Sequence, residues 1–413
     1  MISVAGTQMQ MAAILWHVNE ISHQPIALGA VGLARILPII LFSLLAGVAA
    51  DIWNRRRLLF FTQSGLALLA LFLGFATLRG NDSLPLIYLV VALSGAITTF
   101  DLPARQSLVP NLVPPEDLTN AFSLNTIAFQ TGSIAGPALA GVVLANAGIA
   151  WCYLLNALSY IAVLGALAWM GPVPQQSAAR AGGPTGPRAL VASVRDGLQF
   201  VLSQRLIFSS MLLDFFATFF SSAKALLPIF AGEVLAVGAV GYGWLVAAPA
   251  IGSLAVGIVI STRATIRNQG RLLLSSVFGF GIATVIFGLS QSFWLTFLAL
   301  VGTGTTDTVS TIIRNAIRQL RTPDSLRGRM TSVNQIFFMG GPELGEMEAG
   351  LVAQIWGPVV SVVTGGIGCL IAVAWTRWRY PELAAYHGDD VVSPEAAATD
   401  GARSPAASSR GLP

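Results

Sequence analysis

Two long apolar runs, separated by a short charged segment, constrain this chain more than any other feature. The runs extend over 27–50 and 58–78, and each exceeds the roughly 20 residues that a helix needs to cross about 30 Å of hydrocarbon. Between them lie Asp51 and the basic residues Arg55, Arg56 and Arg57. Because short arginine-rich loops stay on the cytoplasmic side of a membrane, the segment predicts a helical hairpin with its turn inside the cell.

The composition supports a membrane protein and removes nucleic acid from the expected partners. Apolar residues make up 54% of the chain and charged residues 10%, against about 25% charged residues in soluble domains. Of the 23 basic residues, all but Arg35, Arg79 and Lys224 fall in segments predicted to face the cytoplasm. The net charge of +4 therefore reflects orientation in the membrane. Cys152 and Cys369 lie in apolar runs, where we expect core packing rather than a disulfide or a metal site.

The apolar runs predict twelve transmembrane helices. The expected spans are 1–18, 27–50, 58–78, 84–104, 119–147, 149–170, 206–228, 241–261, 272–290, 293–313, 331–356 and 358–376. These spans give an N-terminal six-helix half over 1–170 and a C-terminal half over 206–377. Between the halves we expect a cytoplasmic linker over 171–205, rich in Pro, Gly and Arg, with a short amphipathic helix near 190–202. The remainder, 378–413, is predicted to be a disordered cytoplasmic tail.

An internal repeat supports the division into two halves. A fixed spacing of 209 residues links the region around the fifth predicted helix to the region around the eleventh. The pairs are Arg105 and Arg314, Pro114 and Pro323, Ser123 and Ser332, Asn125 and Asn334, Gly136 and Gly345, and Gly141 and Gly350. Gly32 and Pro38 repeat as Gly243 and Pro249 at a spacing of 211. The pattern predicts an all-α membrane protein with two pseudo-symmetric halves related by an axis along the membrane normal.

The charged hairpin also resembles a known signature. A glycine, Gly47, four residues before Asp51 and followed by a basic cluster, looks like the loop between the second and third helices of the major facilitator superfamily. The usual pattern has Arg after the Asp and Gly before the basic pair, where this chain has Ile52 and Asn54. The resemblance implies a transporter with twelve helices.

Two further motifs narrow the resemblance. The segments 100–106 (FDLPARQ), 109–114 (VPNLVP) and Asn120-Ala121 look like the transmembrane secretion effector family, which includes siderophore and macrolide exporters. The fifth predicted helix carries a glycine-proline pattern similar to that of proton-coupled exporters in the superfamily, at Gly132, Gly136, Pro137 and Gly141. Such glycines allow close helix contact and the proline bends the helix, although both residues are common in membrane helices.

Charges predicted to lie inside the membrane are costly and need a reason. Asp214, in the seventh span, is followed by aromatic residues that include Phe215 and Phe219. An acid beside aromatic rings suits a cavity for an apolar or cationic substrate, and the acid can carry a proton. The alternative is an acid paired structurally with a neighbouring helix. Lys224 is expected to snorkel to the outer surface. His17 and His23 have no metal-ligand spacing and carry no predicted role.

We expect gates on both sides of the membrane. An inner gate would combine Gly47 and Asp51 with Arg55, Arg56, Arg57, Asp101, Arg105 and Arg314, while Asp101 and Asp307 brace the cytoplasmic loops. Asp51 would meet the N-terminus of the eleventh helix near 330–333. At the outer side, Arg35 and Glu346 lie at similar predicted depths. Since the resemblance implies that the second and eleventh helices face each other, Arg35 would pair across the halves with the face of Glu343 and Glu346, or alternatively with its own half. Asn125, one of the repeated positions, joins the expected substrate cavity.

The resemblance and these charges together predict a secondary active transporter. We expect proton-coupled efflux of an amphipathic small molecule, such as a siderophore, a macrolide or another drug-like compound, by alternating access. An importer or lipid flippase of the same fold, or a non-transporting membrane scaffold or sensor, are the alternatives. No Gly-rich phosphate loop with Lys-Ser/Thr is present, and no catalytic set can be assembled, so we expect no enzyme, cofactor or metal. The expected partners are substrate, protons and lipid, for a monomer in the bacterial inner membrane.

Overall fold

The computed structural model describes residues 1–108, 112–171, 195, 197–262, 268–323 and 326–388, and these residues form helices with no strand. Long helices before the linker are α1 (Ile2–Ser22), α2 (Pro25–Ile52), α3 (Arg55–Leu78), α4 (Leu84–Leu108), α5 (Leu118–Asn146) and α6 (Ile149–Trp169). After it come α8 (Arg205–Phe220), α10 (Gly238–Ser261), α11 (Gln269–Leu289), α12 (Phe293–Arg321), α13 (Arg327–Trp356) and α14 (Pro358–Arg379). Short elements are η2 (Pro115–Asp117), η4 (Ala223–Leu226), α9 (Leu227–Ile229), η5 (Phe230–Val234) and α15 (Pro381–Ala385).

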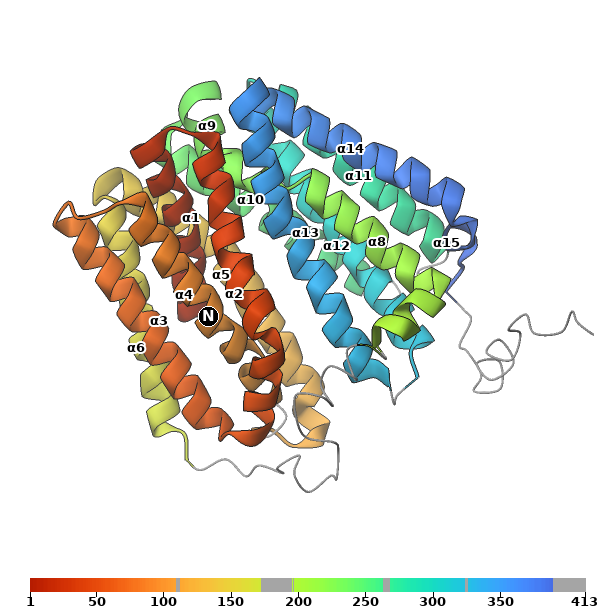
Figure 1. The fold of residues 1–413 in the computed structure, drawn as a ribbon, viewed down its shortest axis with the longest axis horizontal. Coiled ribbons are helices and arrows are strands. Elements are labelled where there is room, and N and C mark those ends of the chain that lie inside the picture. The colour runs from red at the N-terminus through yellow and green to blue at the C-terminus, as the bar shows by residue number, and fades with distance from the viewer. Residues whose placement is uncertain (109–111, 172–194, 196, 263–267, 324–325, 389–413) are drawn as a thin grey trace, which may run out of the picture.

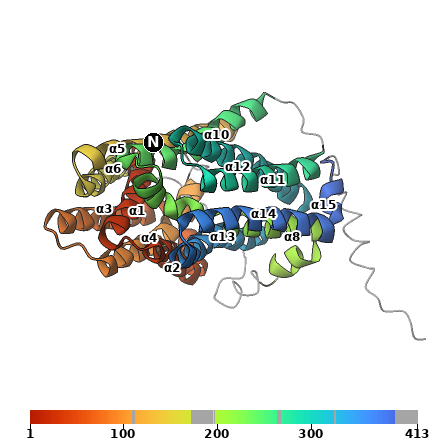
Figure 2. The same ribbon diagram turned by 90° about the horizontal axis from the view of Figure 1, so that it is seen from above.

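The helices before and after the linker gather on opposite sides of the molecule. Figure 1 shows α1 to α6 on the left and α8 and α11 to α15 on the right, and Figure 2 shows the same separation from above. Between the two groups, α2 and α13 lie side by side where α2 begins and α13 ends, and they diverge toward their other ends (Figure 1). On the far side of the molecule α5 packs against α10. The two groups therefore meet mainly through these two helix pairs.

Equivalent residues of the repeat make equivalent contacts. A Cβ atom added at Gly141 would lie 3.1 Å from the Cα atom of Val240, which corresponds to Gly29 at the spacing of 211, where α5 meets α10. A Cβ atom added at Gly350 would lie 3.0 Å from Gly29 Cα, where α13 meets α2. Gly148 and Gly357 are 209 residues apart and begin the turns into α6 and α14 with φ of 90° and 89°, a conformation that favours glycine. The sequence repeat is thus also a repeat of backbone geometry and packing.

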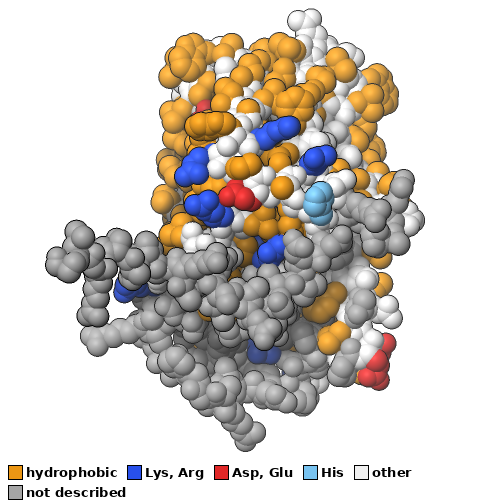
Figure 3. Space-filling model, turned by 90° about the vertical axis from the view of Figure 1, so that its right-hand side faces the viewer, with side chains coloured by type: hydrophobic (Ala, Val, Ile, Leu, Met, Phe, Trp, Pro, Cys, Tyr) orange, Lys and Arg blue, Asp and Glu red, His pale blue; other side chains and the backbone are white. Residues whose placement is uncertain are grey.

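Nine helical segments of the described chain are long and apolar enough to cross a membrane. They are Pro25–Ser43, Arg55–Leu78, Leu84–Arg105, Asn120–Asn146, Ile149–Trp169, Arg205–Val234, Gly238–Ser261, Gln269–Leu289 and Pro358–Arg379. The long helices α1, α12 and α13 are not among them because polar side chains interrupt their apolar character. Figure 3 views the face at the α15 end, where hydrophobic side chains cover the upper part and basic side chains gather below them.

Two predicted boundaries were wrong. The tail expected from residue 378 begins with ordered structure, because α14 runs to Arg379 and α15 follows with Leu383 fully buried. The tenth span was expected to end at 313, whereas α12 continues to Arg321. The seventh span, expected over 206–228, lies within the apolar segment Arg205–Val234, although α8 ends at Phe220 and η4 begins at Ala223. Most of the linker and 389–413 lie outside the described residues, although 197–203 are helical.

Candidate functional site

The contact between α2 and α13 depends on glycines of α2 that face acidic residues of α13. A Cβ atom at Gly32 would lie 2.7 Å from the Glu343 backbone oxygen and 3.0 Å from both Cβ and Oε2 of Glu346. Since glycine leaves this space open, the two backbones approach closely and α2 covers the Glu346 side chain, which is 6% exposed.

Arg35 joins the two groups of helices by an ion pair. Its Nη1 donates a hydrogen bond to Glu343 Oε1 at 2.9 Å, and the two side chains are only 18% and 16% exposed. The Arg35 backbone is also held against α4, because a Cβ atom at Gly95 would lie 2.8 Å from Arg35 O. A partly buried guanidinium on a fixed backbone therefore meets a carboxylate that is 308 residues away in the chain.

Glu346 and Lys224 complete a cluster of four charged groups, which we call the α2–α13 charge cluster (Arg35, Lys224, Glu343 and Glu346). Glu346 Oε2 is buried and accepts no hydrogen bond within the described residues. The Lys224 ammonium couples electrostatically to Glu346, Arg35 and Glu343, while its side chain is exposed. Lys224 was predicted to snorkel outward, and its exposed side chain does not contradict this. The break after α8 places it on η4, which packs against α13 and α2.

A hydrogen bond across helices accompanies that break. Ser222 lies between α8 and η4, and its Oγ donates to the Pro342 backbone oxygen of α13 at 2.7 Å. The serine thereby ties the interruption to α13 one residue before Glu343. The polar residues Ser221, Ser222 and Lys224 interrupt the apolar sequence here and were the available signal for the break.

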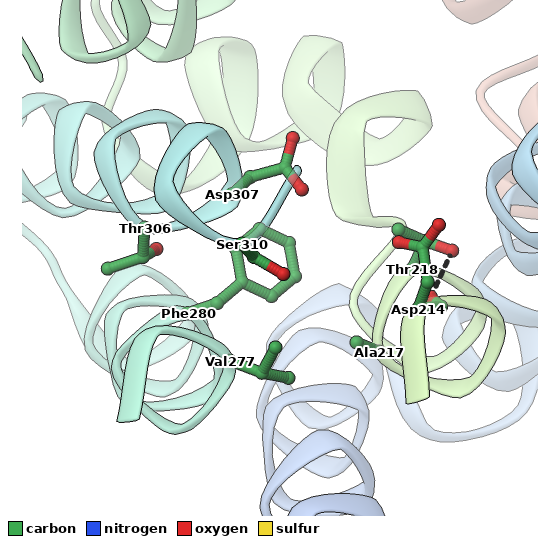
Figure 4. Close-up of a pocket in the computed structure, with 8 residues that line it drawn as sticks. All are labelled: Asp214, Ala217, Thr218, Val277, Phe280, Thr306, Asp307 and Ser310. Carbon is green, nitrogen blue, oxygen red and sulfur yellow. Dashed lines mark hydrogen bonds between the residues drawn. The ribbon is translucent and has the colours of Figure 1, made fainter. Parts of the chain in front are cut away.

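A second charged group lies among α8 and α12. Asp214 is 5% exposed and its Oδ1 is in direct contact with Arg314 Nη1. Arg314 is itself 2% exposed, donates from Nη2 to Thr311 Oγ1 at 2.7 Å and lies 3.7 Å from Asp307 Oδ1. The placement of Arg314 at a cytoplasmic loop was therefore wrong. Because α12 is longer than expected, Arg314 lies inside the helix packing beside Asp214, while the Asp307 side chain is exposed. Figure 4 shows Asp214 on α8 and Asp307 on α12, which both line a small cavity.

The aromatic residues that follow Asp214 pack on one another. The rings of Phe215 and Phe219 stack with centroids 5.9 Å apart, and Phe215 meets Phe337 of α13 edge-on at 6.1 Å. Both rings are partly buried. The structure thus pairs Asp214 with an arginine of a neighbouring helix, which is the structural alternative considered from the sequence, and gives the phenylalanines partners of their own.

The expected inner-gate residues divide between two helix-packing sites. Asp101 is buried and accepts hydrogen bonds from Thr62 (2.8 Å), Gln63 (2.6 Å) and Arg105 (2.8 Å). Arg56 donates to the backbone oxygens of Leu167 and Ala168 at the end of α6, at 2.8 and 3.0 Å.

The basic cluster itself stands at the start of α3. Asn54, which occupies the glycine place of the resembling motif, caps α3 by accepting a hydrogen bond from Arg57 N at 3.1 Å. Arg55 is the first residue of α3. Gly47 and Asp51 lie in the last turns of α2, and their side chains fall outside the described part of the chain, as does the expected contact of Asp51 with α13.

The glycine-proline motif of α5 serves two different contacts. Gly132 and Gly136 face α1, since a Cβ atom at Gly136 would lie 2.5 Å from Ala5 O. Pro137 and Gly141 face α10, where a Cβ atom at Gly243 would lie 2.5 Å from Pro137 O. Asn125 is exposed near the start of α5.

Sequence reasoning missed a buried histidine. His17 is 2% exposed, its Nε2 lies 2.8 Å from Asp82 Oδ2 and its Nδ1 lies 3.0 Å from the Tyr153 hydroxyl. The three residues come from α1, the loop before α4, and α6. Only the helical spacing of apolar residues around His17, which turns it inward, could have indicated this position.

Comparison with known proteins places the chain among membrane transporters. The family model described as transmembrane secretion effector matches residues 1–398. Enterobactin exporters EntS from Shigella boydii serotype 18 and from Escherichia coli O81 are each 27% identical over 330 residues, which cover 79% of this chain and 77% of the relative.

Solved structures share the fold at lower identity. A bacterial homologue of the human lysosomal transporter Spinster, inward-facing and unoccupied, aligns with a TM-score of 0.70 and 16% identity over 95% of this chain and 97% of that chain. The xylose transporter XylE of E. coli, inward open, aligns with a TM-score of 0.68 and 12% identity over 96% of this chain and 98% of that chain. The matched proteins are transporters rather than enzymes.

Proposed function

Since the chain belongs to the transmembrane secretion effector family, we propose that it is a proton-coupled exporter of an amphipathic small molecule that works by alternating access. It is a membrane transporter with many helices crossing the bacterial inner membrane. The relatives at 27% identity are named as enterobactin exporters, and this supports a siderophore or a similar amphipathic compound as cargo and efflux as the direction.

The proposed architecture is two halves of six membrane-spanning helices, with the linker and the C-terminus in the cytoplasm. The equivalent contacts of Gly141 with Val240 and of Gly350 with Gly29 support this pseudo-symmetry. We assign α1, α12 and α13 as spans as well. Helices that pack between other helices can carry polar residues inward, and α13 does so with Glu343 and Glu346.

The observation that carries the proposal is the α2–α13 charge cluster. The two groups of helices are in contact where α2 begins and α13 ends, which is the outer side in the proposed orientation (Figure 1). Opening that side must separate Arg35 from Glu343 and uncover Glu346. A proton on Glu346 removes a charge that would otherwise be buried without a hydrogen bond on Oε2. Proton binding and outer closure are therefore linked, and the cluster is both outer gate and coupling site.

The inner gate remains part of the proposal. Rocking of the halves about a central site needs contacts that close the inner side when the outer side opens. Gly47, Asp51 and the basic residues at the start of α3 lie at the inner end of α2, where they can meet the start of α13. In the described conformation α2 and α13 diverge at that end (Figure 1).

Transport into inverted membrane vesicles tests the proposal. Vesicles containing the unmutated protein should accumulate a labelled siderophore or macrolide from a panel when their lumen is acidified, and collapse of the proton gradient should abolish accumulation. Glu346→Gln should leave the protein folded but uncouple accumulation from the gradient. Glu348→Gln, two residues away and partly exposed, is the matched control and should transport normally. Accumulation by Glu346→Gln that still collapses with the gradient would remove Glu346 as the coupling residue.

A further inference from the structure

Exposed arginines stand at the ends of α8, α11 and α14 that meet α15. Arg205 begins α8, Arg271 lies in the first turn of α11, and Arg377 and Arg379 lie in the last turn of α14. α14 packs against α8 and α11, and α15 contacts all three helices. Each of the three belongs to a segment long and apolar enough to cross a membrane, so these arginines lie at the membrane boundary. Figure 3 shows basic side chains on this face below a hydrophobic area.

Two of these arginines have partners in the protein. Arg205 Nη1 lies 3.3 Å from Glu382 Oε1 of α15. The Arg379 guanidinium lies over the Tyr380 ring, 5.3 Å from its centroid. Both side chains are therefore engaged with α15 or with the residue that precedes it.

Arg271 and Arg377 have no acidic partner of this kind. Neither makes an ion pair with any other residue that the structure describes. The charged residues that adjoin this face in sequence but lie outside the described part of the chain sum to zero charge, and they are Arg263, Arg267, Asp389 and Asp390. The positive charge of Arg271 and Arg377 is thus not balanced by the described protein.

Arg271 and Arg377 lie at the same level of the membrane. α11 and α14 touch through glycines, since a Cβ atom at Gly281 would lie 3.1 Å from Gly366 O. The two helices are antiparallel, because α11 begins and α14 ends beside α15. Arg271 is ten residues before Gly281 and Arg377 is eleven residues after Gly366. At 1.5 Å per residue these separations are about 15 Å and about 17 Å, so the levels agree.

An exposed apolar stripe runs along each helix from the level of its arginine. The members recur every three or four residues, and they are Phe278, Ile282 and Ile286 on α11 and Ile367, Ile371 and Trp375 on α14. Arg271 shares the α11 stripe, because it precedes Phe278 by seven residues, which is about two helical turns. Trp378, 78% exposed, ends the α14 stripe beside Arg377. Each stripe therefore leads from hydrocarbon to a guanidinium.

The two stripes lie on the same side of the helix contact. Ile282 follows Gly281 and Ile367 follows Gly366, so each isoleucine is rotated by about 100° from the contacting glycine. Seen from one end, antiparallel helices turn in opposite senses, and equal rotations away from a shared contact point to the same side. We call this strip, with its two stripes and the side chains of Arg271, Arg377 and Trp378, the α11–α14 surface.

The N-terminal half uses an arginine differently at the equivalent place. At the spacing of 209 residues, Trp378 corresponds to Trp169, which is also exposed. Arg377 corresponds to Ala168, whose backbone oxygen accepts a hydrogen bond from Arg56 Nη2 at 3.0 Å. In that half the guanidinium of α3 binds the end of α6. In the C-terminal half the end of α14 carries its own guanidinium and presents it to the surroundings.

We propose that the α11–α14 surface binds one anionic phospholipid, with its phosphate between Arg271 and Arg377 and its acyl chains along the two stripes. Guanidinium groups form paired, charge-assisted hydrogen bonds with phosphate oxygens. Tryptophan prefers the level of the lipid headgroups, where Trp378 lies. A zwitterionic lipid carries a cation beside its phosphate, so two unbalanced arginines favour a lipid with net negative charge. The site lies away from the contacts between the halves and is additional to transport.

Native mass spectrometry of the purified full-length protein in detergent tests this site. The protein is titrated with phosphatidylglycerol and, separately, with phosphatidylcholine that has the same acyl chains. One basic residue near an anionic surface contributes a factor of about five, so two predict a preference for one phosphatidylglycerol of about 25-fold. The double variant Arg271→Gln with Arg377→Gln should lose most of this preference and bind phosphatidylcholine as before.

The double variant Arg205→Gln with Arg379→Gln is the charge-matched control, since both arginines have partners in the protein. It should retain the bound phosphatidylglycerol. Equal losses in the two double variants would show diffuse attraction to a basic face and overturn the site, as would equal binding of the two lipids by the unmutated protein.

Glycerol phosphate separates a lipid site from a phosphate site. It carries the anionic group without acyl chains, so an equal concentration should not displace phosphatidylglycerol, and displacement would overturn the lipid as occupant. A monodisperse elution profile and an unchanged thermal midpoint in lipid-free detergent establish that each variant is folded. Because no transport is measured, the result is independent of whether Glu346→Gln uncouples efflux.

Discussion

A single methyl group at Gly32 should shift the protein away from its outward-closed conformation. An added Cβ atom would lie 2.7 Å from Glu343 O and 3.0 Å from Glu346 Cβ and Oε2. The Glu346 side chain can rotate away, but the Glu343 oxygen belongs to the α13 backbone. The two helices must therefore separate by about 0.5 Å or more to reach ordinary van der Waals distance, and the ion pair of Arg35 with Glu343 lies beside the strained point.

The size of the effect follows from the cost of overpacking. Inserting a methyl group into a tight contact costs about 1–3 kcal/mol. In this protein the cost falls only on the conformation in which α2 and α13 touch. Since about 1.4 kcal/mol corresponds to a tenfold change in an equilibrium constant, the closed population should fall by about five- to 100-fold relative to the open one.

Cross-linking at the closed end measures this population. Ile26 N lies 3.5 Å from Gln354 Oε1, so cysteines at these two positions should be joined by a short bifunctional thiol reagent in the unmutated background. Because the rate follows the fraction of closed molecules, Gly32→Ala should slow cross-linking by up to the factor given above. Gly165→Ala is the control, because a Cβ atom there meets nothing within 4 Å, and it should leave the rate unchanged. Equal rates for Gly32→Ala and Gly165→Ala would show that the glycine contact does not set the closed state.

Three other perturbations have defined outcomes. Arg35→Gln should lower the thermal midpoint of the purified protein, because it leaves the partly buried Glu343 carboxylate without its cation. The double variant with Glu343→Gln should recover most of that loss, and no recovery would mean that the pair is not coupled. Asp51→Asn should keep the thermal midpoint but slow export in vesicles, and full-rate export would exclude Asp51 from the inner gate. Gly357→Ala should destabilise the folded protein by about 1–3 kcal/mol through backbone strain at its φ of 89°. The control Gly171→Ala, at a residue with no positive φ, should leave the thermal midpoint unchanged. Equal midpoints for the two variants would contradict the strain argument.

Helix positions could be predicted from apolar length, but helix ends could not. The run 293–313 marks the apolar part of α12 and says nothing of the two further turns to Arg321. A better signal for that end was Pro323, since the residue before a proline avoids helical geometry and helices end at or shortly before it. The misplaced end moved Arg314 from the helix interior to a loop, and its pairing with Asp214 was lost with it.

The candidate site was predictable where depth decides which residues of two facing helices meet. The resemblance implied that α2 and α13 face each other, counting residues from the helix ends placed Arg35 at the depth of the α13 acids, and the structure has Arg35 on Glu343. The position of Lys224 could not be found in this way, because it depends on the break between α8 and η4 at 221–222.

The α2–α13 contact and the α5–α10 contact are two copies of one repeated contact, and their chemistry has diverged. In the repeat, Glu346 of the α2–α13 contact corresponds to Pro137 of the α5–α10 contact, and Arg35 corresponds to Val246. A duplicated contact has thus kept its close glycine packing on both sides but acquired ionisable groups on one side only. Separation of α5 from α10 depends on packing alone and should be indifferent to pH, whereas separation of α2 from α13 carries the whole electrostatic cost. Selection could therefore tune the driving force of the cycle by substitutions in one copy, while the other copy preserved the geometry of the motion.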